Sequence, residues 1–248
     1  MTSLLKDQVA IITGGGRGFG AGIAQAFALA GAQVIIAEQD PEAGEIIAQE
    51  MGITALCCDI SQKGALDDVV NQVIEQFGRI DIFVNNAGVT HLPTPLEEVS
   101  DADFERIIAV NAWAVFYAAR AVVPIMKRSG AGVILNIAST AAKSPRPGLC
   151  WYNASKGWLV TATQSMAIEL APYKIRVNAL NPVAGETPLL KRFMGEDTPV
   201  MREKFLATIP LGRFSTPQDI GQAARFLCSP EAAMITGVAL EVDGGRCI

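Results

Sequence analysis

The chain has 248 residues, of which 50% are hydrophobic and 18% are charged, with a formal net charge of −5 and a pI near 5.0. This length and apolar content predict one compact domain with a large buried core. The acidic balance excludes a nucleic-acid-binding surface, because neutralising phosphates requires clustered Lys and Arg that the chain lacks. We therefore expect a small molecule as the partner.

The ends, cysteines and histidine narrow the function classes further. No apolar run is long enough to cross a bilayer without a charge or a glycine, so we expect a cytoplasmic protein without membrane contact. The five cysteines are odd in number and form no CxxC pair, which excludes a disulfide framework and a zinc knuckle. Because His91 is the single histidine, we expect no metal site, and we interpret it as an exposed loop residue.

Short β-branched runs alternate with longer amphipathic segments along the chain. The predicted strands are Gln8–Thr13, Gln33–Ala37, Thr54–Cys58, Asp81–Asn85, Gly132–Ala138, Lys174–Leu180 and Val238–Val242. The predicted helices are 18–30, 41–51, 62–77, 100–128, 152–171 and 217–229. Near-continuous apolar strands indicate a sheet covered on both faces, and the strand–helix alternation indicates parallel pairing with right-handed crossovers.

These elements predict an α/β fold over residues 1–248: a single Rossmann-type domain with a doubly wound, parallel, seven-stranded sheet and helices on both faces. One long insert, Asn181–Pro217, is rich in Pro, Gly and Thr and has no clear strand pattern. Segments of that length in compact domains are commonly functional, so we expect a substrate lid at about 183–216.

The glycine-rich stretch TGGGRGFG, Thr13–Gly20, follows a predicted strand and opens a predicted helix. Unsatisfied backbone N–H groups and the helix dipole attract a phosphate at such a place. It is not a Walker loop, because no Gly-Lys-Ser/Thr follows. Two dinucleotide-binding spacings fit: G-x-G-x-x-G/A on Gly16, Gly18 and Ala21, and a wider one that begins at Gly14. A turn that serves only strand–helix packing is the alternative.

Two acidic residues follow predicted strands. Glu38 comes eighteen residues after Gly20, where a carboxylate can accept both ribose hydroxyls of an adenosine. A solvated loop glutamate is the alternative. Asp59 ends the third strand and can either meet the adenine edge or cap the next helix. Together with the glycine loop, these acids indicate a dinucleotide site.

A second constellation lies downstream, where Ser139 ends a strand and Tyr152 and Lys156 follow in the sequence WYNASKG. Positions i and i+4 share one face of a helix, so the phenol and the ammonium project into the same space. A Tyr-x-x-x-Lys spacing alone is common and usually structural. With a strand-end serine and an upstream dinucleotide loop it predicts a catalytic group.

The order of the motifs resembles that of the short-chain dehydrogenase/reductase family over the whole chain. Besides TGGGRGFG they are NNAG at Asn85–Gly88, VNAWAVF with Asn111, YNASK at Tyr152–Lys156, IRVNALNP at Ile175–Pro182 and VDGG at Val242–Gly245. The segments IPLGRFSTPQDI and ITGVALEVDGG are similar to a subgroup that includes acyl-carrier reductases and bacterial polyol, sugar and ketone dehydrogenases. Val183 departs from the family, which usually has glycine there.

The resemblance implies hydride transfer between a nicotinamide cofactor and a secondary alcohol or ketone. Tyr152 is the implied general acid/base, and Ser139 the implied hydrogen-bond partner of the reacting oxygen. Because a free phenol has a pKa of about 10, Lys156 and the oxidised nicotinamide are expected to lower it. Asn111 is implied to hold a water between Lys156 and solvent, with a helix kink or a satisfied buried amide as the alternative.

The resemblance also implies which residues contact the cofactor. They are Gly14, Arg17, Gly18, Phe19, Gly20, Glu38, Asp59, Ile60, Asn86, Gly88, Tyr152, Lys156 and Thr187, the last at the nicotinamide amide. We expect NAD rather than NADP, because Glu38 repels a 2′-phosphate. Arg17 argues for NADP, since a basic residue there holds that phosphate in several relatives, but it can turn to the carboxylate or to solvent.

Two other functions stay open. One is reduction of 3-oxoacyl groups on a carrier protein, for which Lys127 and Arg128 offer part of a basic docking patch. The other is a non-catalytic dinucleotide-binding regulator, although all four catalytic positions are present. The resemblance implies a homotetramer formed through helices 100–128 and 152–171 and the strand Val238–Val242.

Several side chains near these motifs have two interpretations. Leu149 and Trp151 can line the pocket or belong to a subunit contact. Arg146, Lys191 and Arg192 can meet an anionic substrate group, but basic residues on a mobile loop are usually solvated.

Overall fold

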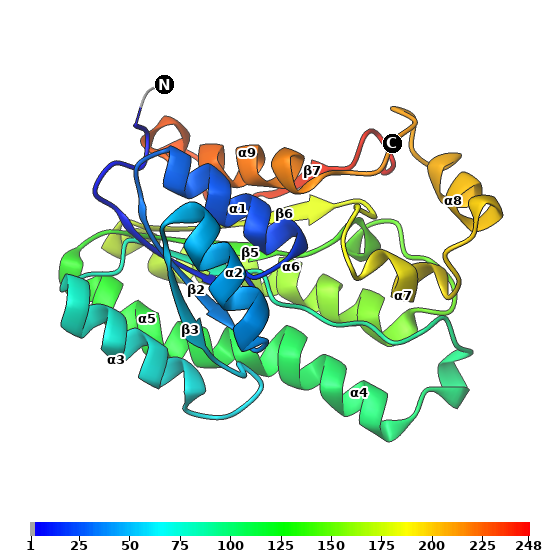
Figure 1. Cartoon of the computed structure of the whole chain (residues 1–248), viewed down its shortest axis with the longest axis horizontal. Helices are drawn as coiled ribbons and strands as arrows, with labels where there is room; N and C mark the ends of the chain where they lie inside the picture. The colour runs from blue at the N-terminus through cyan, green and yellow to red at the C-terminus, as the bar shows by residue number, and fades with distance from the viewer. Residues whose placement is uncertain (1–2) are drawn as a thin grey trace.

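The computed structural model describes residues 3–248, which contain one parallel seven-stranded sheet in the order β3-β2-β1-β4-β5-β6-β7 (Figure 1). The predicted doubly wound sheet is confirmed, because the order reverses between β1 and β4. Each predicted strand is present within two residues of its expected ends. The strands are β1 Val9–Thr13, β2 Gln33–Glu38, β3 Thr54–Cys57, β4 Ile82–Asn85, β5 Gly132–Ile137, β6 Ile175–Pro182 and β7 Ala239–Val242.

Helices cover both faces of this sheet (Figure 1). Helices α1, α2 and α9 pack on one face, and α3, α5 and α6 pack on the other. The helices are α1 Gly18–Leu29, α2 Pro41–Met51, α3 Ala65–Phe77, α4 Asp101–Ile108, α5 Ala114–Ser129, α6 Cys150–Leu170, α7 Leu190–Met194, α8 Pro199–Leu206 and α9 Pro217–Cys228.

The strands serve both cores because their side chains alternate between the two faces. Ile11 of β1 packs toward α3 and α5, whereas its neighbours Ala10 and Ile12 pack toward α1 and α9. In β5, Ile134 packs on the same face as Ile11, and Leu135 packs on the opposite face. Both faces are therefore apolar, as a parallel sheet requires.

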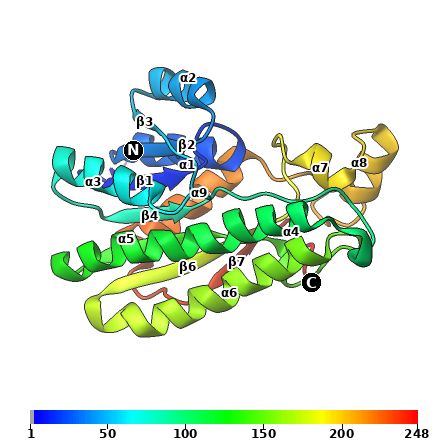
Figure 2. The ribbon, with the colours of Figure 1, turned by 90° about the horizontal axis from the view of Figure 1, so that it is seen from below.

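The predicted helix 100–128 is not one regular helix. A π-helical turn, Ala109–Trp113, separates α4 from α5 and contains Asn111. The combined segment Asp101–Ser129 contains an 18-residue window with a mean hydropathy of 1.5, so by length and composition alone it could cross a membrane. In the fold it runs beside α6 and packs against the sheet (Figure 2). One face of the segment packs in the core, and the opposite face is exposed.

The segment 183–216 contains two short helices, α7 and α8, that the sequence analysis did not predict. It also has an apolar cluster of its own, formed by Val183, Leu190, Met194, Phe205, Ile209 and Phe214. Positive φ angles outside glycine occur within residues 3–248 at Asp7 and Lys174, so Val183 adopts an ordinary backbone conformation. The departure from the family glycine is therefore unstrained, and Val183 anchors this segment.

Candidate active site

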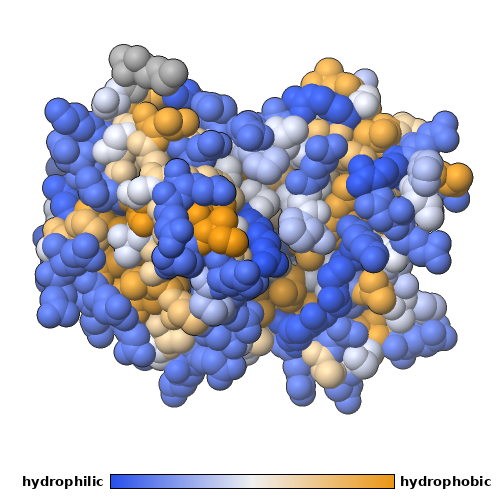
Figure 3. Space-filling view, viewed as in Figure 1, coloured by the Kyte–Doolittle hydropathy of each residue, from blue (hydrophilic) through white to orange (hydrophobic). Residues whose placement is uncertain are grey.

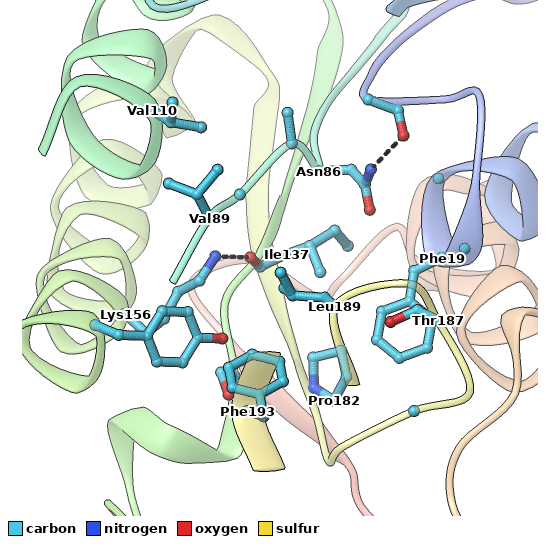
Figure 4. A pocket seen from close by; sticks show the side chains of 18 of the residues that line it. Phe19, Asn86, Val89, Val110, Ile137, Lys156, Pro182, Thr187, Leu189 and Phe193 are labelled. Carbon is cyan, nitrogen blue, oxygen red and sulfur yellow. Dashed lines mark hydrogen bonds between the residues drawn. The ribbon is translucent and has the colours of Figure 1, made fainter. Parts of the chain in front are cut away.

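A single cavity of about 470 Å³ contains most of the predicted site residues. It lies at the carboxyl ends of the strands, where doubly wound sheets bind ligands. The glycine loop forms one end, and the segment carrying α7 and α8 covers it; the molecular surface is hollowed between this segment and the main body (Figure 3). Phe19 and Thr187 lie on one side of the cavity, and Lys156 and Phe193 lie on the other (Figure 4).

The glycine loop has the geometry of a phosphate cradle. Gly14 and Gly18 have φ angles of 64° and 55°, in the left-handed region that favours glycine. A Cβ at Gly20 would overlap the carbonyl oxygen of Gly14. Glycine is thus required at these three positions, which supports the wider spacing that begins at Gly14.

Helix α1 begins at this loop with its backbone donors available. Arg17 is its N-cap residue, and within residues 3–248 its side chain makes no capping hydrogen bond. Helices α2 and α9, in contrast, are capped by Asp40 and Thr216. The first-turn N–H groups of α1 are therefore suited to bind an anionic group of a dinucleotide.

Thr13, the last residue of β1, and Asn86, the first residue after β4, hold the loop in place. The Asn86 side-chain amide donates hydrogen bonds to the carbonyl oxygens of Thr13 at 2.9 Å and Gly14 at 3.0 Å (Figure 4). The buried Thr13 hydroxyl accepts the N–H groups of Asn86 and Ala87, each at 3.1 Å. The sequence analysis missed Thr13, although a threonine at a strand end directly before the glycines was the available signal.

Glu38 is held at the edge of the cavity. Its carboxylate accepts the N–H groups of Gly16 at 2.9 Å and Asp40 at 3.1 Å. It is therefore a fixed carboxylate rather than a solvated loop residue. Arg17 pairs with Asp40 at 2.6 Å and not with Glu38, and both partners of that ion pair are exposed.

Asp59 lies at the cavity wall and does not cap the next helix. It lines the cavity together with Ile60. It also accepts hydrogen bonds from the backbone N–H of Ser61 at 3.0 Å and from the Ser61 hydroxyl at 2.7 Å. These contacts hold the turn after β3, whereas Gly64 is the N-cap residue of α3. Asp59 is therefore a turn-forming residue at the cavity wall and not the helix cap.

The predicted catalytic side chains converge at the other end of the cavity. Tyr152 and Lys156 project from α6, and Ser139 follows β5. The side chains of Ser139 and Tyr152 both line this end of the cavity, and the Ser139 hydroxyl acts to lower the pKa of the Tyr152 phenol. The Lys156 ammonium donates to the carbonyl oxygen of Ile137 at 2.8 Å and lies 5.9 Å from the centre of the Tyr152 ring (Figure 4).

Burial shifts the two titratable groups toward their neutral forms. It raises the pKa of Tyr152 to about 12, although the hydrogen bond from Ser139 acts in the opposite direction. It lowers the pKa of Lys156 to about 8. In the protein alone, burial therefore outweighs the expected effect of Lys156 on the phenol. Further positive charge is needed to make Tyr152 a base at neutral pH.

Asn111 is a satisfied buried amide in the π-helical turn, one of the two alternatives that the sequence left open. Its Nδ2 donates to the carbonyl oxygen of Val89 at 3.0 Å and to the Ser155 hydroxyl at 2.9 Å. Its Oδ1 accepts the N–H of Val89 at 2.9 Å. The Ser155 hydroxyl donates in turn to the carbonyl oxygen of Tyr152 at 2.7 Å, so Asn111 positions the catalytic helix through a residue that the sequence analysis missed.

Gly88 and Thr187 lie at places where segments distant in the sequence come close together. A Cβ at Gly88 would lie 3.2 Å from the Lys156 Nζ and 3.5 Å from the Asn111 Oδ1, so the small residue leaves room between them. Thr187 lies against the glycine loop, because a Cβ at Gly18 would be 3.0 Å from its methyl group. The covering segment thus contacts the loop directly.

The interpretation of His91 is wrong, and the structure distinguishes the alternatives for Arg146, Lys191, Arg192 and Leu149. His91 is 1% exposed rather than an exposed loop residue, and its Nδ1 is hydrogen-bonded to the carbonyl oxygen of Leu92 at 2.7 Å. Arg146 and Arg192 line the cavity, whereas Lys191 is exposed. Leu149 is buried at the cavity wall. The loop that precedes α6 folds inward, which a pattern of neighbouring residue types could not indicate.

The fold and this cavity define the class of protein: a dinucleotide-binding α/β domain with a Tyr–Lys–Ser group at the carboxyl edge of its sheet. A family model described as enoyl-(acyl carrier protein) reductase matches residues 14–246. The chain belongs to the short-chain dehydrogenase/reductase family of oxidoreductases.

Individual relatives match over nearly the full length. The chain is 44% identical over 250 residues to 4-formylbenzenesulfonate dehydrogenase of Comamonas testosteroni, covering 98% of this chain and 99% of that protein. It is 37% identical over 246 residues to 7alpha-hydroxysteroid dehydrogenase of Escherichia coli K12, covering 97% of this chain and 94% of that protein. The crystal structure of 3-ketoacyl-(acyl-carrier-protein) reductase from Brucella melitensis, complexed with NADH, superposes with a TM-score of 0.94 at 50% identity, covering 98% and 100%.

Proposed function

We propose that this protein is an NAD-preferring oxidoreductase that transfers a hydride between a nicotinamide cofactor and a secondary alcohol or ketone. The observation that carries the proposal is the convergence of Ser139, Tyr152 and Lys156 at one end of a cavity whose other end is the glycine loop. The crystal structure of the similar Brucella melitensis protein is a complex with NADH, which supports a nicotinamide cofactor for this protein.

The chain's own residues account for the steps around the hydride transfer. Ser139 orients the reacting oxygen by a hydrogen bond. Tyr152 donates a proton to that oxygen during reduction and accepts it during oxidation. An oxidised nicotinamide, when bound, accepts the hydride and adds positive charge beside the phenol. This charge, together with Lys156, favours the phenolate that burial disfavours.

Glu38 is proposed to select NAD. Its carboxylate is fixed by two backbone N–H groups at the cavity edge, where the adenosine ribose is expected. A 2′-phosphate there would meet a like charge that cannot easily rotate away. Arg17 is held by Asp40 rather than by Glu38, and Gln39 adds no second cation.

Reduction of carrier-bound 3-oxoacyl groups is the alternative, and the name of the Brucella melitensis structure favours it. The basic pair Lys127 and Arg128 does not support it. This pair ends α5 next to Gly132, where β5 begins, so it lies at the edge of the sheet opposite the cavity. Lys127 also packs over the ring of Tyr173 at 4.0 Å. The same relatives include proteins named for an aromatic aldehyde and a steroid, which are small free molecules.

A substrate panel tests the proposal. Secondary alcohols, sugars, ketones and an acetoacetyl carrier protein are assayed by nicotinamide absorbance with NAD and NADP in parallel. We expect turnover of a free alcohol or ketone with a higher kcat/KM for NAD. Turnover of the carrier substrate alone would support the alternative, and cofactor binding without turnover of any of them would support a regulator.

We also propose a homotetramer formed through α4, α5, α6 and β7. The outer face of these helices carries exposed apolar side chains, including Trp113, Phe116, Trp158 and Ile168. Such a face is typical of an interface. The runs 121–123 and 158–160 contribute less to this exposed face than expected, because Val122 and Leu159 are buried in the chain's own core. Light scattering that gave about 26 kDa, the mass of one chain, would contradict the assembly.

A further inference from the structure

Two arginines at the substrate end of the cavity have no acidic partner. Arg146 precedes α6 and Arg192 belongs to α7, and both line the cavity. Within residues 3–248, no carboxylate oxygen lies within 4.0 Å of either guanidinium. Arg202, on the same covering segment, differs because it pairs with Asp197 at 2.6 Å. The chain carries a net charge of −5, so this end of the cavity contrasts with the whole.

Arg146 is fixed at the boundary between the main body and the covering segment. Its guanidinium carbon lies 4.0 Å from the centre of the Phe205 ring, and its Nη2 donates to the Thr208 hydroxyl at 3.1 Å. Its carbonyl oxygen accepts the side-chain amide of Asn153, the neighbour of Tyr152, at 2.8 Å. The planar group is thereby held in a defined place close to the catalytic helix.

The charges around Arg146 are positive. Burial and the neighbouring Arg246 guanidinium lower its pKa to about 10, so it stays charged at neutral pH. Arg246 is itself held by the hydroxyl and the carbonyl oxygen of Ser144, another cavity residue. Within residues 3–248, neither Arg146 nor Arg246 forms an ion pair with a carboxylate, so an anion bound here would add a favourable interaction.

Arg192 has an unused donor. Its Nε is buried, and among the described residues it has no hydrogen-bond partner. The next residue, Phe193, places its ring 5.1 Å from the ring of Tyr152 in an edge-to-face arrangement. Arg192 is therefore adjacent in sequence to a residue that contacts the catalytic tyrosine.

We propose that Arg146 and Arg192 bind a carboxylate or sulfonate group of the substrate, so that the enzyme acts on anionic alcohols or ketones with an apolar or aromatic body. The inference rests on the proposed function of the cavity. Guanidinium groups form paired, charge-assisted hydrogen bonds with planar or tetrahedral oxyanions. Leu149, Phe193 and Phe205 supply apolar walls to the same cavity.

The proposed ligand is a small anion and not an acidic protein. Both guanidinium groups line the cavity itself, and Arg146 is stacked on a ring at its wall. A purely structural role explains the contact of Arg146 with Thr208, which ties the covering segment to the body. It does not explain Arg192, which lines the cavity and forms no ion pair within residues 3–248.

A binding experiment tests the site without turnover. Benzoate, benzenesulfonate and neutral benzamide are titrated calorimetrically into the protein with NADH present, and the series is repeated without NADH. Charge-assisted hydrogen bonds predict that each anion binds about tenfold or more tightly than benzamide. Arg146→Gln and Arg192→Gln should each weaken anion binding by about tenfold. Arg202→Gln, the matched control, should leave it unchanged. Equal affinity for benzoate and benzamide, or equal losses in all three variants, would overturn the inference.

A turnover experiment separates this inference from the proposed function. The ratio of kcat/KM for 4-acetylbenzoate to that for its methyl ester measures the use of the anionic group in molecules of similar shape. We expect the acid to be preferred and the ratio to fall about tenfold in Arg192→Gln, with no fall in Arg202→Gln. A ratio near one in the wild type would overturn the inference. Anion binding without turnover of either molecule would contradict the proposed function and leave the anion site supported.

Discussion

The two ends of the cavity are built in different ways. At the glycine end, backbone groups face the ligand: the uncapped N-terminus of α1, the left-handed Gly14 and the crowded Gly20. At the tyrosine end, side chains from distant segments face it, and two of them, Tyr152 and Lys156, are shifted toward neutrality by burial. The first end requires the absence of side chains, whereas the second requires particular ones.

This difference assigns separate tasks to the two ends. In the proposed function, the rigid backbone cradle binds the part of the cofactor that does not react. In the proposed function Tyr152 and Ser139 handle the proton, and the covering segment places Phe193 against the ring of Tyr152. Changes at one end should therefore alter cofactor affinity, and changes at the other should alter turnover or substrate choice.

The largest expected effect concerns the ionisation of Tyr152. Burial raises its pKa to about 12, so at pH near 10, the ordinary phenol value, we expect almost no phenolate from this residue. Bound NAD should lower this pKa below about 10, a change of about a hundredfold or more in proton affinity. The absorbance difference between wild type and Tyr152→Phe, followed against pH, measures it.

NADH is the matched control for this titration, because its nicotinamide ring lacks the positive charge. We expect NADH to leave the phenol protonated. A strong phenolate signal at neutral pH without any cofactor would mean that Lys156 alone activates the tyrosine.

The next effect is at the glycine end. Gly20→Ala would place a Cβ against the Gly14 carbonyl oxygen and close to the Asn86 amide. Overpacking of this kind costs about 1–3 kcal/mol, so NADH affinity measured by fluorescence titration should fall by about tenfold to a hundredfold. Gly132→Ala, which crowds only the flexible Met126 side chain at the opposite edge of the sheet, is the control. If Gly20→Ala binds NADH as tightly as Gly132→Ala does, the proposed cofactor site at the glycine loop is contradicted.

The smallest effect is cofactor choice. Glu38→Ser removes the carboxylate that Gly16 and Asp40 hold. We expect the wild type to prefer NAD by about tenfold in kcat/KM, which needs about 1.4 kcal/mol, and the variant to lose most of this preference. Equal kcat/KM with both cofactors in the wild type, or no gain in kcat/KM with NADP in the variant, would show that another residue determines the cofactor preference.

The glycine end was more predictable from the sequence than the tyrosine end. Gly14, Gly18, Gly20 and Glu38 come directly after apolar runs or within a few residues of them, so local pattern places them at strand ends. Tyr152, Lys156 and Ser139 were found by their spacing. The π-helical turn at Asn111 was not, because a one-residue insertion in a helix leaves the apolar period almost unchanged.

The position of the covering segment was expected from the sequence, but its two helices could not be predicted, for a different reason. Helices α7 and α8 have five and eight residues, too short for a helical period to stand out among Pro and Gly. The positions of Arg146, Arg192 and His91 depend on how this segment and the neighbouring loops fold over the sheet. Such contacts are tertiary, and charged residues in loops look alike whether they face a cavity or water.

The most direct test of the central claim is the Tyr152→Phe variant, which removes one hydroxyl and little volume. We expect kcat to fall by about a hundredfold or more, because general acid–base catalysis contributes about 10²–10⁴-fold. The dissociation constant for NADH should stay within about threefold of the wild-type value, since the glycine end is unchanged. If the variant keeps more than about a tenth of the wild-type kcat, Tyr152 is not the acid/base, and the assignment of proton transfer to this end of the cavity is contradicted.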